Sequence, residues 1–451
     1  MTIETLNIKY FTGNDIPKHY IEDEFLGKSE GAHAVFVPKN HEEVVSAVNY
    51  ANEHDLNIIA RGSGTGLSAA TFPNLNTIIL DMTAMNRIID LNPKTMTLTV
   101  EPGVELQTIQ EYVEKHHFFY PPDPGSKNSS IGGNIATNAG GMRALKYGVT
   151  RDYVRALTVV LANGETLELG SENVKSSSGY DLKHLFIGSE GTLGITTQIK
   201  LKLIPLPQYS ESLILAFDDL HTASTNVNKI IKAGLSPSAL EFFERDMLQM
   251  SMDETKIPFV TDKGQAFLLV TIDGTSTEFI QEEVKKLRDV VGKDADDFVE
   301  LDEIQNRNVW KLRDNLLQAV VNYTEQVTLD ETVPVHLIAK LYDYTKELEH
   351  EYGVSIMSFG HAGDGNLHTC VLRGDLSQTE WDTKRDDVLT LLYAKIKEYE
   401  GLPSAEHGIG LIKKKYFYQM MDPTYIKYLQ RVKLAFDPEN RLNPGKVFDI
   451  E

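Results

Sequence analysis

Three glycine-rich segments in the first half of the chain constrain its fold more than any other feature of the sequence. The first is residues 61–68, Arg-Gly-Ser-Gly-Thr-Gly-Leu-Ser, directly after an expected strand at 56–60. The second is a Gly/Pro/Asn-rich stretch at 121–141, and the third is Gly-Ser-Glu-Gly-Thr-Leu-Gly-Ile at 188–195. Long stretches of this kind inside compact domains are usually functional. Successive backbone N–H groups in such turns can surround phosphate oxygens. For residues 61–68 alone, a phosphate-binding turn and a turn without a ligand fit equally well.

The first glycine segment does not match a Rossmann fingerprint, which requires Gly-x-Gly-x-x-Gly at the start of a helix. Position 67 is Leu, and residues 68–73 (Ser-Ala-Ala-Thr-Phe-Pro) do not begin a convincing helix. Asp81 lies at about the right separation for a ribose contact, which we attribute to coincidence. A Rossmann domain is therefore excluded.

Composition narrows the class of protein. The 451 residues are 41% hydrophobic, which favours two or three domains with a large core. The net charge is −21 and no Lys/Arg face is visible, so we expect no nucleic-acid partner. The single cysteine, Cys370, excludes an intrachain disulfide and any Cys-based zinc or iron–sulfur site.

The sequence also indicates where the protein works. We expect no signal peptide, because residues 1–10 lack a basic region followed by an apolar one. No apolar run approaches the ~18 residues of a membrane span, so we expect no transmembrane segment. With one cysteine, the expected location is the cytoplasm, and peripheral contact at the inner membrane face stays open.

Strand and helix patterns divide the chain near Pro205 and Pro207. Before that point we expect a helix capped by Asn40, with Glu43 completing a capping box, and a hairpin turning at Asn163-Gly164. The expected strands there are 34–38, 56–60, 77–81, 95–100, 154–161 and 166–169.

The second half predicts a ferredoxin-like β-α-β-β-α-β unit followed by helices and a hairpin. The expected strands are 213–217, 239–243, 266–272, 298–301, 355–359 and 367–372. The expected helices are 222–233, 278–291, 303–322, 334–351 and 383–399.

Histidine and carboxylate residues gather in two glycine-flanked loops of the second half. Residues 360–368 read Gly-His-Ala-Gly-Asp-Gly-Asn-Leu-His, and Glu406-His407 precede Gly408. A tight turn at Asp364-Gly365 would bring His361 and His368 close across two strands. Two imidazoles and one carboxylate are a standard ligand set for a divalent transition metal. Each histidine taken singly is more often a surface or hydrogen-bonded residue.

Taken in order, these motifs resemble one family. The motifs are residues 61–68, Glu101-Pro102-Gly103-Val104, Asp123-Pro124-Gly125-Ser126, Ile131-Gly132-Gly133-Asn134, Asn138-Ala139-Gly140-Gly141, Lys146-Tyr147-Gly148 and 188–195. The chain resembles the FAD-dependent oxidoreductases of the vanillyl-alcohol oxidase (PCMH-type) fold. More narrowly, it is similar to the branch of the glycolate oxidase catalytic subunit, D-lactate dehydrogenase and D-2-hydroxyglutarate dehydrogenase.

The resemblance implies an α+β protein in three parts. These are a PCMH-type FAD-binding domain at 1–206, a ferredoxin-like α+β substrate (cap) domain with a metal site at 207–410, and a helical C-terminal segment at 411–451 that packs back on the FAD domain.

The resemblance also implies which residues hold FAD. They are Arg61, Gly62, Ser63, Gly64, Thr65, Gly66, Leu67, Pro124, Ser126, Gly132, Gly133, Asn134, Asn138, Gly140, Gly141, Tyr147, Glu190, Gly191, Gly194, Ile195 and Asn443. Some relatives attach the flavin to a His in the first loop, whereas residues 62–65 here contain no His or Cys. We therefore expect noncovalent FAD. For the Asn443-Pro444-Gly445-Lys446 segment, the alternative is a simple helix stop and tail turn.

For the chemistry, the resemblance implies His361, His368 and Glu406 as ligands of a divalent metal (Zn, Fe or Mn) and His407 as the catalytic base. It implies that Arg313 grips the substrate carboxylate, which its planar fork suits; the alternative is a surface salt bridge. Cys370 departs from relatives that carry Asn there, which puts a 2-hydroxyglutarate substrate in doubt. Leu317 leaves the length of the acid open.

The implied function is an FAD-dependent dehydrogenase that oxidises a small D-2-hydroxy acid, D-lactate or glycolate above others, to the 2-oxo acid. The alternative is a noncatalytic flavin electron-relay subunit, and a transferase use of the fold ranks last. Quinone, an electron-transfer flavoprotein, an iron–sulfur subunit and oxygen all stay open as electron acceptors, and a homo-oligomer is an option.

Overall fold

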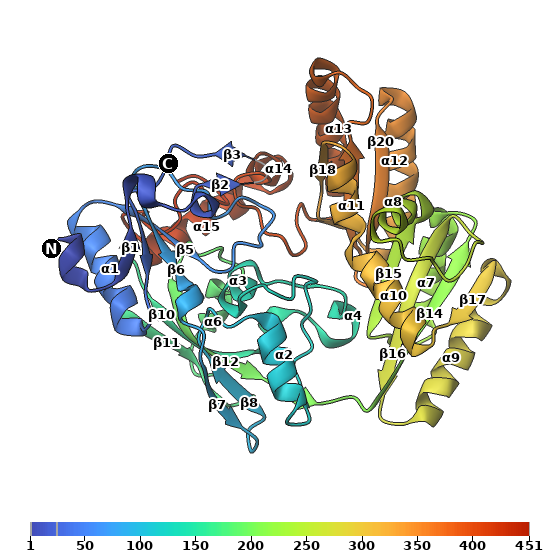
Figure 1. Ribbon diagram of the computed structural model, residues 1–451, viewed down its shortest axis with the longest axis horizontal. Coiled ribbons are helices and arrows are strands. Elements are labelled where there is room, and N and C mark those ends of the chain that lie inside the picture. The colour runs from blue at the N-terminus through green and yellow to red at the C-terminus, as the bar shows by residue number, and fades with distance from the viewer. Residues whose placement is uncertain (1, 24–25, 451) are drawn as a thin grey trace. The chain divides into compact units, whose positions relative to one another are not determined.

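The computed structural model describes residues 2–23 and 26–450, which fold into two compact units (Figure 1). The first unit contains the described residues up to Gly140, residues 149–206 and the C-terminal segment from Glu406. The second unit contains residues 141–148 and 207–405. The chain therefore passes between the units four times.

The first unit contains two sheets. The smaller has the strand order β1(Lys9–Phe11), β4(Ala34–Val37), β6(Thr77–Asp81), β5(Asn57–Arg61). In it β4, β6 and β5 run parallel and β1 is antiparallel. The larger is antiparallel, with the order β11(Thr166–Gly170), β10(Val154–Val160), β12(Ile195–Lys202), β8(Thr97–Val100), β7(Ile88–Asn92). The expected hairpin at Asn163-Gly164 joins β10 to β11.

Helices and short strands complete this unit. They are α1(His41–Glu53), α2(Leu106–Glu114), α3(Ile131–Thr137), α5(Thr150–Tyr153), α6(Lys183–Phe186), α14(Lys414–Met420), α15(Pro423–Phe436), β2(Glu22–Asp23), β3(Gly27–Lys28), β9(Phe118–Phe119) and β13(Ile204–Pro205). Asn40 caps α1 as expected, accepting the N–H of Glu43 at 2.9 Å. The capping box expected at Glu43 does not form in its usual way. The Glu43 carboxylate reaches one residue further back and accepts the N–H of Lys39 at 2.8 Å.

The second unit is built on an eight-stranded sheet whose paired strands run antiparallel. Its order is β17(Asp297–Glu300), β14(Tyr209–Phe217), β16(Ala266–Gly274), β15(Ala239–Glu244), β20(Ser355–His361), β21(Asn366–Leu372), β18(Gln326–Thr328), with β19(Glu331–Thr332) also paired to β21. When β14, β15, β16 and β17 are numbered 1 to 4 along the chain, their order in the sheet is 4-1-3-2, which is that of a ferredoxin-like unit. The hairpin expected around Asp364-Gly365 is β20–β21.

The helices of this unit are α4(Ala144–Tyr147), α7(Leu220–Lys232), α8(Arg245–Thr255), α9(Thr277–Val291), α10(Glu303–Asp314), α11(Leu316–Tyr323), α12(Ile338–Tyr352) and α13(Gln378–Glu398). The single helix expected at 303–322 is two helices separated at Asn315. The Asn315 amide donates to Glu254 of α8 at 3.3 Å, and Leu312 and Leu316 on either side of it enter one core. The polar-rich helix α8 has no counterpart among the expected elements.

The short segment 141–148 carries α4 into the second unit. The Tyr147 hydroxyl donates to the buried Asp273 carboxylate at 2.8 Å, and Lys146 forms an ion pair with the same carboxylate. A Cβ atom at Gly363 would lie 2.5 Å from Leu145, so α4 packs closely against the turn of the β20–β21 hairpin.

Among the described residues, no helix is both long and apolar enough for a membrane crossing.

Candidate active site

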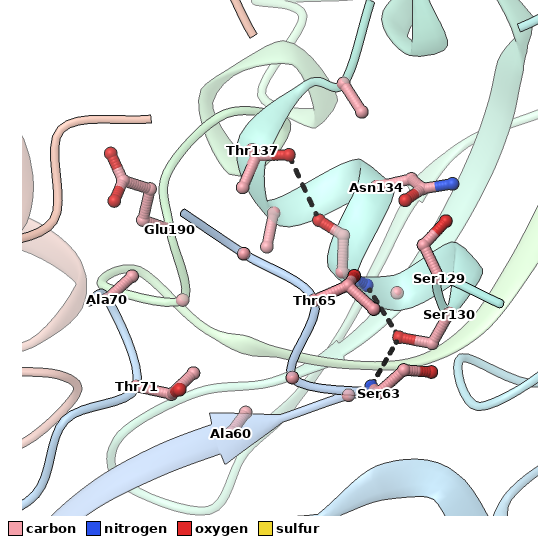
Figure 2. Close-up of a pocket in the computed structure, with 18 of the residues that line it drawn as sticks. Ala60, Ser63, Thr65, Ala70, Thr71, Ser129, Ser130, Asn134, Thr137 and Glu190 are labelled. Carbon is pink, nitrogen blue, oxygen red and sulfur yellow. Dashed lines mark hydrogen bonds between the residues drawn. The ribbon is translucent and has the colours of Figure 1, made fainter. Parts of the chain in front are cut away.

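A cavity within the first unit is walled by the three glycine-rich segments of the sequence (Figure 2). Most of the residues expected to hold FAD line it: Gly62, Ser63, Gly64, Thr65, Gly66, Leu67, Pro124, Ser126, Gly132, Gly133, Asn134, Glu190, Gly191, Gly194 and Asn443. Ser68 and Thr137, which belong to the expected FAD segments 61–68 and 132–138, line it too. Lining residues that sequence reasoning missed include Ala70, Thr71, Met82, Pro102, Ser129, Ser130, Ser189 and Thr196. Several of them are small residues, which carry no motif by themselves.

Ser130 joins two of the glycine-rich segments. It is the N-cap of α3, and its Oγ accepts the N–H of Gly133 at 3.3 Å. The same Oγ accepts the N–H of Ser63 at 3.3 Å, as the dashed lines of Figure 2 show. One hydroxyl therefore fixes the first glycine loop against the start of α3, the helix within the second segment.

Close packing explains two of the glycines. A Cβ atom at Gly62 would lie 1.9 Å from Ser130 Oγ, and one at Gly132 would lie 2.7 Å from the Pro102 side chain. Neither position accepts a side chain without displacing a wall of the cavity.

Two buried polar atoms in the cavity wall test whether FAD fits. The hydroxyl of Ser129 and Oδ1 of Asn443 are buried and have no hydrogen-bond partner among residues 2–23 and 26–450. Buried polar groups are nearly always paired, so both are available to a polar ligand. FAD supplies hydroxyl, amide and phosphate groups, and the residues therefore fit it.

The other residues expected to hold FAD lie outside the lining. The Arg61 guanidinium folds under the first loop, donates to the carbonyl of His19 at 3.1 Å and blocks a side chain at Gly64. Asn138 has a left-handed backbone (φ 54°) and accepts the N–H of Arg151. Ile195 is buried at the start of β12. Gly141 and Tyr147 belong to the second unit.

Glu190 ties the third glycine segment to the C-terminal segment of the same unit. Its fully enclosed carboxylate accepts the N–H groups of Ile409 at 2.7 Å and Gly410 at 2.8 Å. Burial raises the pKa of Glu190, although these two N–H groups oppose the shift. The Asn443 amide donates to the Glu190 carbonyl at 2.8 Å, so Asn443 lies beside the third glycine segment.

Glu406 and His407 line the same cavity. Glu406 Oε1 and His407 Nε2 lie 3.9 Å apart. The remaining expected FAD residue, Gly140, lies beside them, because a Cβ atom there would be 3.2 Å from Glu406 Oε2. A proposed ligand and a proposed base thus adjoin the proposed flavin site.

The second unit brings His361 and His368 together. Their rings come from neighbouring strands of the hairpin, with centroids 5.3 Å apart and an interplanar angle of 84°. In register His368 is opposite Phe359, two residues from His361, so both imidazoles occupy one face of the sheet. Both side chains are about 5% exposed.

Arg313, on α10, is also buried, and its guanidinium lies next to His361. It pairs with the carboxylate of Glu241, which lies on β15, and that carboxylate is 2.8 Å from His361 Nδ1. Burial acts to raise the pKa of Glu241, but the charges of Arg313 and His361 outweigh it and hold that pKa below its ordinary value. Arg313 is therefore part of an interior ion cluster and not of a surface salt bridge.

Asp330 was missed by sequence reasoning and anchors the chain next to Glu406. Its carboxylate accepts the Ser404 hydroxyl at 2.5 Å, the Ala405 N–H at 3.1 Å and the Asn366 amide at 3.2 Å. It also lies 3.9 Å from His368 Nδ1. Asp330 therefore holds the last residues of the second unit, which directly precede Glu406 in the sequence.

Cys370 is fully buried and lies 3.3 Å from the Thr328 hydroxyl. Burial raises the pKa of its thiol to about 12. Since the thiolate is the reactive form, this residue acts as a small core side chain.

Comparison with known proteins identifies the class. Residues 206–447 match the family model for FAD linked oxidases, C-terminal domain, and residues 32–170 match the FAD binding domain. Two solved structures share the fold at a TM-score of 0.75: 4-ethylphenol oxidase from Gulosibacter chungangensis (20% identity, covering 96% of this chain and 92% of that one) and p-cresol methylhydroxylase (18% identity, 94% and 89%). The chain is an FAD-linked oxidoreductase, and its expected α+β, PCMH-type fold is confirmed.

More similar relatives narrow the class. The chain is 37% identical to D-lactate dehydrogenase of Anaerostipes hadrus, covering 97% of this chain and 94% of that protein. It is 37% identical to the glycolate oxidase subunit GlcD of Bacillus subtilis (92% and 88%) and 33% identical to D-2-hydroxyglutarate dehydrogenase of Stutzerimonas stutzeri (97% and 93%). The chain therefore belongs to the family of FAD-dependent 2-hydroxy-acid dehydrogenases.

Proposed function

We propose that this enzyme oxidises a small D-2-hydroxy acid, D-lactate or glycolate in preference to larger acids, to the 2-oxo acid. The observation that carries the proposal is the pairing of an acid–base couple, Glu406 and His407, with the glycine-walled cavity that fits FAD. The names of the relatives support the substrate class. A bound FAD supplies the two-electron acceptor.

His361, His368 and Glu406 would hold a divalent metal, Zn, Fe or Mn. Imidazole and carboxylate groups are the ligands these ions accept. Asp330 and His407 offer ligand atoms of the same two kinds. The two buried imidazoles suit a site that excludes most water. A metal bound there supplies Lewis-acid polarisation of the substrate oxygens.

The protein's own side chains would bind the substrate carboxylate and remove the hydroxyl proton. Arg313 would bind the substrate carboxylate through guanidinium N–H groups. His407 would take the proton of the α-hydroxyl, a role that an imidazole can perform as a general base. The electrons would then leave through a quinone, an electron-transfer flavoprotein or an iron–sulfur subunit, in the cytoplasm or at the inner membrane face.

The first test follows flavin absorbance without oxygen while D-lactate, glycolate, D-2-hydroxyglutarate or L-lactate is added to the purified protein. We expect D-lactate or glycolate to bleach the band near ~450 nm, a property of the cofactor, and a chelator to abolish the change. Bleaching by D-2-hydroxyglutarate alone would overturn the substrate assignment. Bleaching that persists after verified metal removal would overturn the role of the metal.

The base is tested by His407→Ala. We expect the variant to keep its FAD and lose at least ~100-fold in turnover, the lower range for loss of a general base. The matched control is His350→Ala, which removes an exposed imidazole of α12 and should leave turnover unchanged. A His407→Ala enzyme as active as this control would refute the assignment.

Noncovalent attachment is tested by acid precipitation of the holoenzyme. We expect the yellow colour to stay in the supernatant, since residues 62–65 offer no His or Cys for a bond to the flavin. Colour retained in the washed pellet would contradict this.

A further inference from the structure

Glu241 occupies an unusual position for a carboxylate. It lies in the interior of β15 between Leu240 and Phe242, and its side chain is completely buried. Ionised carboxylates are almost never fully buried unless they are paired. The partners found for Glu241 lie on two other elements, α10 and β20.

Those partners are Arg313 and His361. Arg313 Nη2 pairs with Glu241 Oε2, while His361 Nδ1 lies 2.8 Å from Glu241 Oε1 and 2.9 Å from Oε2. Strand register explains the second contact, because Glu241 is directly opposite His361 in the β15–β20 pair. Arg313 and His361 thus share one carboxylate.

The carboxylate dictates the tautomer of His361. An ionised carboxylate only accepts hydrogen bonds, so Nδ1 must carry the hydrogen. In the neutral ring Nε2 is then unprotonated and is the nitrogen able to ligate a metal. The guanidinium, 3.4 Å from Nδ1, can only donate and by itself would favour an unprotonated Nδ1. The carboxylate oxygens are nearer, at 2.8 and 2.9 Å, and they decide the assignment.

We propose that Glu241 is a positioning residue that fixes His361 as a ligand through Nε2 and at the same time holds the Arg313 guanidinium in place. This inference rests on the proposed function, in which His361 binds the metal and Arg313 the substrate carboxylate. Glu241 touches neither and couples the two groups through one buried anion.

The test compares Glu241→Gln with Glu244→Gln in the FAD-loaded enzyme. Glu244 is a matched control on the same strand: its mostly buried carboxylate accepts the Ser358 N–H at 2.7 Å and the Tyr342 hydroxyl at 3.2 Å, away from both histidines. The measurements are Zn²⁺ and Mn²⁺ affinity in the absence of substrate, and the ¹⁵N shifts of the His361 ring in metal-free protein.

For Glu241→Gln we expect metal affinity to fall 10–100-fold, the usual effect of removing such a partner. We also expect the His361 ring to lose its single Nδ1–H tautomer. Glu244→Gln should keep wild-type affinity within about twofold and leave the His361 shifts unchanged. Wild-type affinity or an unchanged tautomer in Glu241→Gln would overturn the proposal.

If Glu241→Gln does not fold, Glu241→Met combined with Arg313→Leu removes both charges together, a change that buried pairs often tolerate. The same loss of affinity and of the single tautomer is expected. Failure of the proposed function looks different: no acid would bleach the flavin of the wild-type enzyme, while the tautomer contrast between the Glu241 and Glu244 variants would persist.

Discussion

Buried ionisable side chains hold distant segments of this protein together. Lys446, which is not among the proposed catalytic residues, is one of them. Its Nζ donates to the carbonyl of Phe72 at 2.8 Å, which ties the C-terminal segment to the chain just after the first glycine loop. Burial, followed by repulsion from Lys414, lowers the pKa of Lys446 from 10.5 to about 8. Folding therefore disfavours the charged form of this amine relative to the unfolded chain.

This shift predicts a pH dependence of stability. Between about pH 8 and pH 10.5 the unfolded chain binds the proton and the folded chain does not, so this residue makes the protein more stable as pH rises. Relative to Lys446→Met, the wild type should gain up to about 3 kcal/mol across that window. Urea midpoints of both proteins at several pH values would measure the difference. Lys415→Met, at an exposed lysine of α14, is the control, and a pH-independent gap between Lys446→Met and wild type would contradict the prediction.

At this scale the sequence predicts residue types better than partners. Glycine-flanked His361 and His368 are recognisable as a pair, and Glu241 carries a signal too, because a carboxylate interrupts an apolar strand. Its partners could not be inferred, since they depend on β20 lying beside β15 in the sheet and on α10 lying nearby. Asp330 is similar: its role depends on a bridge to Ser404, seventy-four residues away.

Secondary-structure elements set the geometry of the cavity through their ends and turns. The hairpins at Asn163-Gly164 and Asp364-Gly365 follow from local turn chemistry, so they were predictable. The division of 303–322 into α10 and α11 and the presence of α8 were not, because packing around Asn315 determines them. Helix α13 begins at Gln378, five residues before expected, because Ser377 and Glu380 form a capping box.

The junction at Ser130 gives a prediction for an element. Ser130→Ala removes the acceptor shared by Ser63 and Gly133, and losing an N-cap costs about 1 kcal/mol. We expect FAD to bind about fivefold more weakly, measured by reconstitution of the apoprotein. Ser377→Ala, which removes the N-cap of α13 in the second unit, should lower stability comparably and leave FAD affinity unchanged. Equal FAD affinities in the two variants would show that the Ser130 junction does not shape the site.

At the scale of the whole molecule, the first unit is assembled from three separate parts of the chain. The first unit is completed by the segment from Glu406, which supplies three residues of the cavity wall: Glu406, His407 and Asn443. Leu442 joins the core of that unit, and the backbone of Ile58 on β5 is hydrogen-bonded to Arg441 and Asn443. The sequence motif at 443–446 indicated this return.

A chain truncated after Ala405 should therefore purify without FAD. It retains all three glycine-rich segments but loses part of the cavity wall and the partners of the Glu190 carboxylate. Absorbance of the purified protein measures bound flavin, and co-expression of residues 406–451 should restore it. A truncated chain that carries stoichiometric FAD would contradict this reading of the first unit.

The same route bears on how the protein is made. During translation, residues 1–140 and 149–206 leave the ribosome about two hundred residues before the segment from Glu406 that completes their unit. Domains generally fold as units. The first unit therefore cannot complete its fold until residues 207–405 and the segment after them have been synthesised. Flavin capture is then a late event in biosynthesis, possible only after the segment from Glu406 has been made.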